Sequence, residues 1–477
     1  MLFNSFDFIF YFLPALLMLY VVAEKFSFLK RYLQLVFLTF SYFFIGYWST
    51  DALILIICST LFNYNISKAL IKTTNKDVLH KNILRFAVSV NLFVIGYFKY
   101  ANFSINTVNT LFSHNFVRLD IVLPIGISFY TFQQVAYIVD VYKEKAAPKG
   151  LINYALFVAF FPQLIAGPIV LFKDLQSQLL KLKDVNPKWN NIAWAITYFS
   201  IGLFSKVVIA DSLIPYVKPV FSNAEYGMSL GFFEAWTGVI AYTFQLYFDF
   251  SGYTTMAVGL GLLFGIKLPW NFNSPYQSTS IIDFWRRWHI TLSHFLRDYL
   301  YIPLGGNRKG VIRKDVNLMI TMLLGGLWHG AGWNFVIWGG LHGSYLIINH
   351  YFREKIKIKI PKLLAFFVTF LCVIHAWVFF RALTLDGAMS IFKGMYNFSS
   401  INFALISKGA ILKIGVAAII AFSFPATSRL RENSLENDTG IFSKPGYLWL
   451  MLIIFNLSIA FLGMVIGSET EFLYFQF

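Results

Sequence analysis

The sequence predicts an all-α, polytopic integral membrane protein. Of its 477 residues, 57% are hydrophobic, 19% are aromatic and only 13% are charged, whereas a soluble protein carries about 25% charged residues. Apolar runs of roughly 16–22 residues match the length of membrane helices, because the strands of a barrel alternate over about 10 residues. These observations exclude a long soluble enzyme, a disordered chain and a disulfide scaffold.

The apolar segments predict one integral membrane domain over residues 1–477, with roughly ten to twelve transmembrane helices, a short hairpin and interfacial amphipathic helices. The first segment has no basic region before it, so it is expected to stay in the protein as a span. The segments lie near 6–23, 33–49, 52–66, 84–98, 121–139, 152–171, 191–215, 231–266, 316–349, 363–380, 410–425 and 447–467.

Charge and cysteine content narrow the function further. Cys58 and Cys372 both lie in apolar runs, so we expect neither a disulfide framework nor a metal site. The net charge of +16 is too sparsely spread for nucleic-acid binding and is interpreted as an orientation signal. Placing the basic clusters in the cytoplasm puts the N-terminus outside, consistently through residue 150. Between residues 150 and 285 the order of membrane crossings stays open, because the segment 173–188 is basic whichever side of the membrane it faces.

The segment 317–350 breaks the simple pattern of spans, because basic clusters flank it on both sides. Two limbs of about 15 residues, or about 22 Å each, are short against a hydrocarbon core of about 30 Å. A hairpin entering from the cytoplasm would place its turn, Trp328–Asn334, inside the membrane. Non-helical backbone is tolerated at that depth only inside protein or beside a water-filled cavity.

His329 in this turn is the first candidate for chemistry. Ionisable groups at membrane depth are costly and indicate function by default, and a neutral imidazole with a pKa near 6.5 suits a general base. The alternative is a histidine hydrogen-bonded between helices. Trp328 and Asn334, in the same turn, are further candidates for the active site.

His289 is the second candidate. The pattern over 281–300 predicts an amphipathic helix on the cytoplasmic surface, with Trp285 and His289 on one stripe that faces the protein and His294 facing water. His289 would then either line the active site from the cytoplasmic side or pack between helices, and the sequence does not distinguish these two roles.

Two weaker candidates involve charge. The glycine-rich loop 305–310 carries Arg308 and Lys309, which would suit the phosphates of a donor or serve only as orientation charges. Asp249 is an isolated carboxylate in an apolar run and needs a partner, for which we expect an arginine of the 286–297 helix. A structural ion pair is favoured there over a catalytic acid.

Six stretches of the chain resemble the membrane-bound O-acyltransferase (MBOAT) family, in particular its bacterial alginate and peptidoglycan O-acetyltransferase membrane subunits. Together they span most of residues 120–345. The resemblance implies that His329 is the catalytic histidine and that His289 is the second active-site position. The matching stretches are Pro124–Tyr130, Phe161–Pro168, Phe248–Tyr253, Phe284–His289, Arg297–Arg308, and Leu327–Trp333 with Trp338–Gly343.

The resemblance also implies the reaction and its participants. Acetyl would pass from a cytoplasmic thioester, expected to be acetyl-CoA, across the bacterial cytoplasmic membrane to a polysaccharide such as alginate or peptidoglycan. No permanent cofactor is implied; the membrane lipid surrounds the protein, and a periplasmic or membrane-anchored hydrolase-like acetyltransferase would be its partner. Alternatives are D-alanyl transfer to teichoic acid and a transporter or flippase. The second is disfavoured because only one broken element is visible, in 317–350.

The C-terminal tail, 468–477, follows the last span and is expected on the outer side. One interpretation is an aromatic anchor at the membrane interface, and another is disorder. The tail also resembles C-terminal motifs of this acyltransferase system in which a tyrosine is proposed to carry the acyl group. Tyr474 is therefore a candidate acyl carrier, since a phenol with a pKa near 10 leaves more readily than a sugar hydroxyl.

Overall fold

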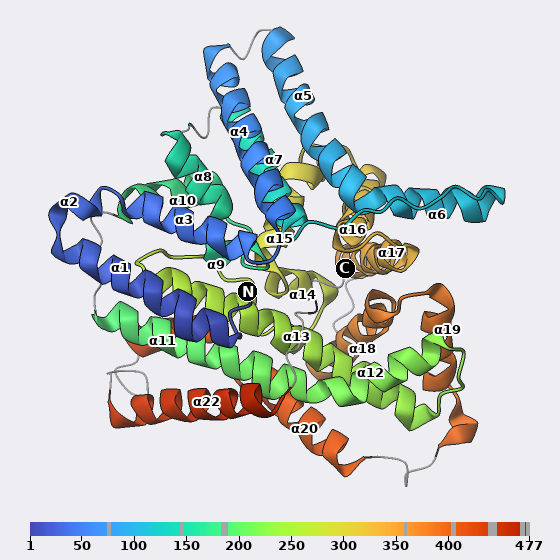
Figure 1. Cartoon of the computed structure of the whole chain (residues 1–477). Helices are drawn as coiled ribbons and strands as arrows, with labels where there is room; N and C mark the ends of the chain where they lie inside the picture. The colour runs from blue at the N-terminus through green and yellow to red at the C-terminus, as the bar shows by residue number, and fades with distance from the viewer. Residues whose placement is uncertain are drawn as a thin grey trace. The chain divides into compact units, whose positions relative to one another are not determined.

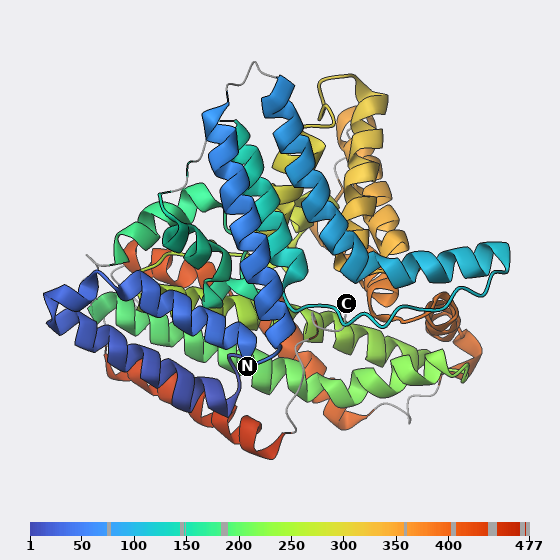
Figure 2. The ribbon, with the colours of Figure 1, turned by 45° about the horizontal axis from the view of Figure 1, so that its top comes forward.

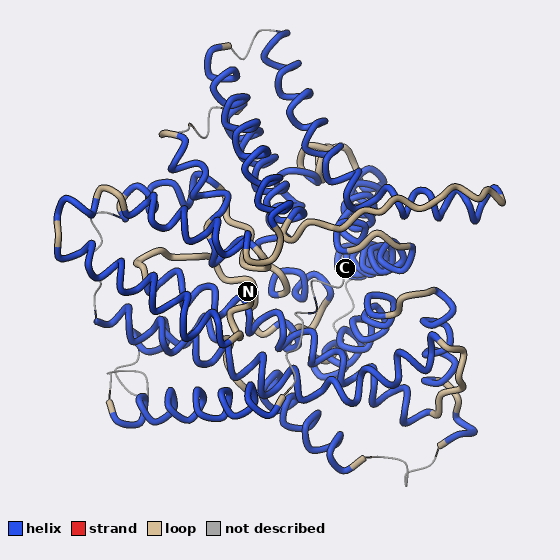
Figure 3. The backbone as a smooth tube through the Cα atoms, viewed as in Figure 1, coloured by secondary structure: helices blue, strands red, loops and turns tan. Residues whose placement is uncertain are grey.

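In the part of the chain that the structure, a computed structural model, describes, the secondary structure consists of helices joined by loops and turns (Figure 3). The chain divides into two compact units, Met1–Phe199 with Tyr253–Pro269, and Ser200–Gly252 with Trp270–Phe477. The interpretation of 1–477 as one domain stays a prediction. The described residues are 1–73, 78–143, 147, 149–182, 189–356, 360–401, 407–436, 446–467 and 473.

The prediction of an all-α, multi-pass membrane protein is confirmed. Within the described ranges, six helical segments are long and apolar enough to cross a membrane. Several other apolar helices are shorter or more polar, so the figure of ten to twelve spans stays a prediction. The six segments are Asp7–Lys25, Thr50–Lys72, Val78–Phe112, Trp189–Glu225, Lys362–Arg381 and Tyr447–Ile466.

The first unit is held together by buried amides between its helices. The side chain of Asn63 on α4 (Thr50–Lys72) exchanges hydrogen bonds with Asn91 on α5 (Val78–Ile95) and donates to Gln134 on α7 (Ile127–Tyr142) at 3.0 Å. Buried polar groups are costly unless paired, so these bonds fix how the three helices face one another. Helices of this unit are η1 Asp7–Phe12, α1 Leu13–Lys25, α2 Ser27–Lys30, α3 Leu33–Gly46, α4 Thr50–Lys72, α5 Val78–Ile95, η2 Gly96–Tyr100, α6 Ala101–Phe112, α7 Ile127–Tyr142, α8 Leu151–Ala159, α9 Phe161–Leu164 and α10 Phe172–Leu180.

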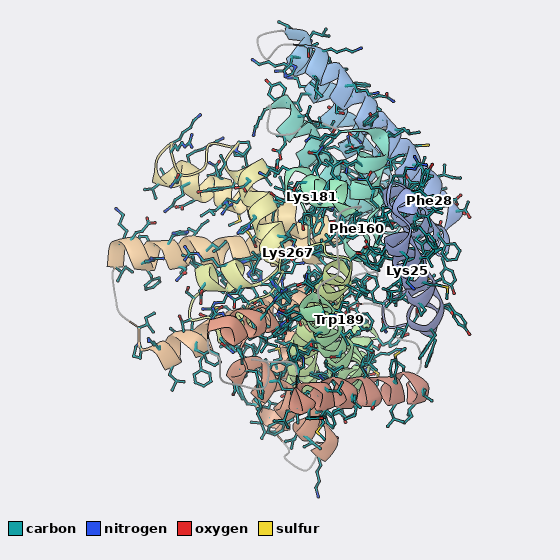
Figure 4. The ribbon with its side chains drawn as sticks, turned by 90° about the vertical axis from the view of Figure 1, so that its left-hand side faces the viewer. Lys25, Phe28, Phe160, Lys181, Trp189 and Lys267 are labelled. Atoms are coloured by element: carbon teal, nitrogen blue, oxygen red, sulfur yellow. The ribbon has the colours of Figure 1, made fainter. Side chains whose placement is uncertain are left out.

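Contacts at one edge of this unit indicate on which side of the membrane α10 ends, a point that the sequence leaves open. Gln34, in the first turn of α3, donates from Nε2 to the Leu179 carbonyl at 2.8 Å. The Gln178 side chain binds both the N–H and the C=O of Lys267, and Figure 4 looks onto this edge, with Lys267 labelled. The end of α10 therefore lies on the same side as the basic cluster 25–31, which the positive-inside rule places in the cytoplasm.

The second unit contains the helices that carry the candidate site. Two long helices, α11 Trp189–Phe204 and α13 Phe232–Leu263, have residues in both units. The remaining helices of the second unit are η4 Ser205–Ala210, α12 Asp211–Glu225, η5 Pro275–Gln277, α14 Ile281–Arg287, α15 Ile290–Leu296, η6 Arg297–Tyr301, α16 Val311–His329, α17 Trp333–Tyr351, η7 Phe352–Ile356, α18 Lys362–Arg381, α19 Leu385–Met395, η8 Phe398–Ser400, α20 Lys408–Ser423, α21 Thr427–Glu436 and α22 Tyr447–Ile466.

The predicted hairpin is present as α16 and α17, which lie side by side (Figures 1 and 2). Each helix has 19 residues, or about 28 Å, so the expectation of two short limbs of about 15 residues is wrong. Helix α16 starts at Val311 and so is longer than expected, because the polar residues before the apolar run are also helical. Gly339 lets the helices approach, since a Cβ there would lie 2.3 Å from the Met322 carbonyl oxygen.

Candidate active site

The hairpin turn places His329 at the C-terminal end of α16, where the sequence predicts it. The helix stops because Gly330 is extended and has no room for a side chain: a Cβ there would lie 2.1 Å from the Phe335 ring. His329 is 6% exposed and the neighbouring Trp328 is 4% exposed. A polar ring is thereby held inside the protein at the turn between two apolar helices.

The segment around His289 differs from the prediction. It is not one amphipathic helix over 281–300: α14 ends at Arg287, α15 begins at Ile290, and His289 has a left-handed backbone with φ of 42°. The stripe that would join Trp285 to His289 therefore does not exist. His289 is fully buried and His294 is exposed, so the predicted facing of these two side chains is confirmed.

Asn271 holds this break in place from a distant part of the sequence. Its backbone carbonyl accepts the N–H of Ile290 at 2.9 Å. Its side-chain Oδ1 accepts the Thr291 N–H at 3.3 Å and the Thr291 hydroxyl at 2.6 Å. Asn271 thus caps the N-terminus of α15, and the segment must turn sharply at His289 to reach it.

The same amide fixes the protonation pattern of His289. The His289 Nδ1 lies 3.4 Å from Asn271 Oδ1. Because the Thr291 N–H can only donate, the Asn271 atom facing it is the oxygen, and His289 Nδ1 must carry the hydrogen. The lone pair of the neutral ring is then on Nε2. Burial lowers the pKa of His289 to about 3, so the imidazole is neutral at physiological pH.

Aromatic rings enclose both histidines. The ring centroids of His289 and His329 are 6.3 Å apart, and Phe250 on α13 lies 4.9 Å from His289. The His329 ring lies 5.1 Å from Trp338 on α17 and 5.2 Å from Phe380 on α18. The structure therefore brings together the two histidines that the sequence identifies, in an apolar setting that strengthens hydrogen bonds.

His342 belongs to the same cluster, although it is not among the candidates that the sequence identifies. Its ring is completely buried and lies 4.8 Å from Trp338, and its Nδ1 accepts a hydrogen bond from Trp285 Nε1 at 3.2 Å. The available signal was helical spacing, because Trp338 and His342 are one turn apart on the face of α17 that meets Trp285 of α14 and Trp377 of α18.

Asp249 has a different partner from the one predicted. Its carboxylate pairs with Lys206 on η4 at 2.7 Å, and not with an arginine of 286–297. Lys206 also binds Asp211 at 2.7 Å, and both Lys206 and Asp249 are 1% exposed. Sequence reasoning missed Lys206, although a lysine inside the apolar run 191–215 is itself a signal that a carboxylate lies nearby.

The remaining candidates have separate surroundings. Asn334 is 5% exposed and donates from Nδ2 to the Ala382 carbonyl at 2.9 Å, which ties the start of α17 to the end of α18. Arg308 and Lys309 are exposed in the turn before α16, and no described contact joins them to the histidines. Tyr474 lies outside the described residues. Leu473 is described: its N–H donates to Asp249 Oδ2 at 3.1 Å.

The chain is similar to known proteins over most of its length. The membrane-bound O-acyltransferase (MBOAT) family model matches residues 35–385. The chain is 38% identical to a "Peptidoglycan O-acetyltransferase" of Helicobacter pylori, over 100% of this chain and 98% of the relative. It is 43% identical to a "Probable alginate O-acetylase AlgI" of Azotobacter vinelandii, over 88% of this chain and 83% of the relative. A "Teichoic acid D-alanyltransferase" of Streptococcus thermophilus is 30% identical over 55% of this chain and 69% of its own length.

Proposed function

The chain belongs to the membrane-bound O-acyltransferase family and is a multi-pass membrane acyltransferase, and we propose that it supplies acetyl for the O-acetylation of a polysaccharide outside the bacterial cytoplasmic membrane. The observation that carries the proposal is the buried pair of histidines, His289 and His329, at the turn of the α16–α17 hairpin. Acetyl is favoured over D-alanyl because relatives named for O-acetylation match 88–100% of the chain, whereas the D-alanyltransferase matches about half.

The proposed donor is acetyl-CoA from the cytoplasm. The charged CoA cannot cross the membrane. An acetyl group can cross if it is taken from the thioester on one side of the buried His329 and passed to an acceptor on the other side. His329 accepts the proton of the attacking hydroxyl while that oxygen forms a bond to the thioester carbonyl carbon. The C–S bond then breaks and the thiolate takes up the proton, which restores neutral His329. General-base catalysis of this kind contributes about 10²–10⁴-fold.

His289 acts beside this step in its neutral form. Since Asn271 holds the hydrogen on Nδ1, His289 offers its Nε2 lone pair as a hydrogen-bond acceptor in the apolar cluster. Trp328 and Asn334 hold the turn that carries His329. Arg308 and Lys309 would contact the donor phosphates from the loop before α16.

Tyr474 is the proposed first acceptor. Its phenol would take acetyl from the thioester, forming an aryl ester and releasing the thiol. The ester then passes acetyl to a hydrolase-like acetyltransferase outside the membrane, which places it on the polymer. Transfer from a phenol with a pKa near 10 to a sugar hydroxyl is downhill. The polymer, with alginate and peptidoglycan as the two candidates named by the relatives, would be selected by that partner.

The test uses His329→Ala, with His294→Ala as the matched control because His294 is exposed on α15. Purified protein in proteoliposomes receives acetyl-CoA with a labelled acetyl group, and thioester consumption and polymer acetylation are both measured. His329→Ala should lower both rates by about 10²–10⁴-fold, and His294→Ala should not. Full polymer acetylation by correctly inserted His329→Ala would refute the proposal. A transporter would not consume the thioester.

A second variant addresses the carrier. Tyr474→Phe keeps the ring and removes only the hydroxyl, so it should abolish polymer acetylation while leaving the protein folded. Unchanged acetylation by this variant would eliminate the carrier role and leave the tail as an anchor.

A further inference from the structure

The buried charge cluster of the second unit contacts the C-terminal tail. Lys206 Nζ lies 2.7 Å from Asp249 Oδ1, and the N–H of Leu473 donates to Asp249 Oδ2 at 3.1 Å. The two oxygens of one carboxylate are thus used by two different groups. Asp249 is 1% exposed and Leu473 is 5% exposed, so this contact is inside the protein and is not a surface encounter.

The local packing shows why the carboxylate is held so firmly. Lys206 lies in the π-helical turn η4, an irregularity often found at functional sites. Gly252, one turn after Asp249 on α13, has no room for a side chain, because a Cβ would lie 2.7 Å from the Gly202 carbonyl oxygen. The two helices therefore approach closely at this level, and the Lys206–Asp249 pair is fixed between them.

The tail contact is made through the backbone. A carboxylate is acceptor-only, and an N–H bonded to it forms a charge-assisted hydrogen bond that is about twice as strong as a neutral one. Because the donor is a main-chain N–H, the bond is indifferent to the side chain at position 473 and depends on the path of the chain. Such a bond fixes the backbone at Leu473 against the Asp249 carboxylate.

The position of Asp249 connects this contact to the histidines. Phe250 is the next residue of α13, and its ring lies 4.9 Å from His289. Adjacent residues of a helix point about 100° apart. One turn of α13 therefore presents a carboxylate to the tail and an aromatic ring to His289, and the residue after Leu473 in the sequence is Tyr474.

We propose that Asp249, paired with Lys206, is a positioning residue that docks the C-terminal tail at Leu473 and so serves the acyl transfer proposed for Tyr474, the next residue in the sequence. The docking stands on the contact itself, whereas its catalytic purpose rests on the proposed function. Lys206 orients the Asp249 carboxylate through their 2.7 Å ion pair.

Two matched variants of the full-length protein test the docking. Asp249→Asn has one acceptor oxygen for two donors, Lys206 and Leu473, so it loses the weaker contact with Leu473. Asp283→Asn is the control, because it breaks a different ion pair, with Arg287 at 3.0 Å, and leaves the Asp249 carboxylate unchanged. The probe is Leu473→Cys, which keeps the backbone N–H, in a background in which Cys58 and Cys372 are replaced by Ala. The measurement is the rate of labelling by a maleimide-polyethylene glycol reagent.

Asp249→Asn should speed labelling of Cys at position 473 by about 10–100-fold, the range expected for one hydrogen bond to a charged group, and Asp283→Asn should change the rate less than about twofold. Labelling that is unchanged in Asp249→Asn, or equally fast in both variants, overturns the docking. If Asp249→Asn fails to give monodisperse protein, Lys206→Met/Asp249→Asn removes both buried charges and is expected to expose position 473 in the same way.

Activity distinguishes docking from the carrier role. If Asp249 acts through Tyr474, Asp249→Asn lowers the rate of acetyl transfer when Tyr474 is present. The double variant Asp249→Asn/Tyr474→Phe is then no slower than Tyr474→Phe alone. Full activity of Tyr474→Phe would refute the carrier while the labelling result still decides the docking. A further loss in the double variant overturns the positioning role, because Asp249 would then act independently of the tail.

Discussion

Close packing of the α16–α17 hairpin predicts the effect of a single methyl group. Gly339→Ala would place a Cβ 2.3 Å from the Met322 carbonyl oxygen and 3.1 Å from the Leu323 Cα. Both neighbours are backbone, so no side chain can rotate away. Ordinary contact begins near 3.4 Å, so the helices must separate by about 1 Å. Gly340→Ala is the matched control, since its nearest neighbour is a flexible Leu323 methyl at 3.6 Å.

The expected magnitude follows from this displacement. Overpacking of this kind costs about 1–3 kcal/mol of stability. Trp338 precedes Gly339 and lies 5.1 Å from the His329 ring, so the same displacement moves the wall of the candidate active site. A misplacement of about 1 Å can cost about 100-fold in rate. We therefore expect Gly339→Ala to lower acetyl transfer by about 100-fold, and Gly340→Ala to lower it less than about twofold.

The assay pairs the rate of acetyl transfer from labelled acetyl-CoA with the apparent melting temperature in detergent. Gly339→Ala should lower both, and Gly340→Ala neither. Equal rates and equal melting temperatures for the two variants would refute the reasoning, because the hairpin would then tolerate the separation. A lower melting temperature with an unchanged rate would show that the packing matters for stability alone.

Three further predictions concern the surroundings of the histidines and the donor loop. Burial lowers the folded-state pKa of His289 to about 3. As the pH drops below about 6.5, the unfolded chain therefore binds a proton at this ring before the folded protein does, and the free energy of unfolding falls. Between pH 7.5 and pH 5 the free energy of unfolding of the wild type, measured by thermal denaturation, should decrease by about 2 kcal/mol more than that of His289→Gln. Asn271→Ala leaves the Thr291 N–H and hydroxyl without their acceptor and should cost about 1–3 kcal/mol, measured as a lower melting temperature, whereas no loss would contradict the cap. Replacing Arg308 and Lys309 together with Ala should raise the apparent KM for acetyl-CoA and spare membrane insertion; an unchanged KM returns both to an orientation role.

Features encoded locally could be predicted from the sequence. The apolar runs give the membrane class, and the glycines at 330 and 332 end one helix and begin the next, so the position of His329 in a turn follows from 317–350 alone. The length of α16 did not follow. Its first turns are polar and basic, and hydropathy does not distinguish a solvated helical extension from a loop.

The break at His289 could not be predicted for a different reason. The segment 281–300 has neither glycine nor proline, and its periodicity is that of an uninterrupted helix. Asn271, 18 positions before His289, caps α15 and imposes the left-handed residue. Long-range contacts override local periodicity here, and a single sequence contains no signal for them.

The partner of Asp249 shows what a charge rule can and cannot establish. That a buried carboxylate requires a cation follows from solvation energy alone. Which cation it is depends on helix packing: Lys206 lies 43 positions earlier, and the arginines of 286–297 were equally acceptable on charge grounds. Lys206, in the apolar run 191–215, likewise requires a buried anion as its partner. A rule that pairs isolated opposite charges from separate apolar runs would therefore have favoured the observed contact with Asp249.

The separation of charge from the histidines has a chemical reason. A carboxylate within about 4–6 Å of an imidazole stabilises its protonated form and raises the pKa, and a protonated ring cannot accept a proton. On α13 the carboxylate of Asp249 is turned to Lys206, and the next residue, Phe250, meets His289 with an apolar ring. The lysine thus pairs with the negative charge of Asp249, while burial holds His289 neutral. The same helix can therefore bind the tail through a charge and keep the adjoining histidine uncharged.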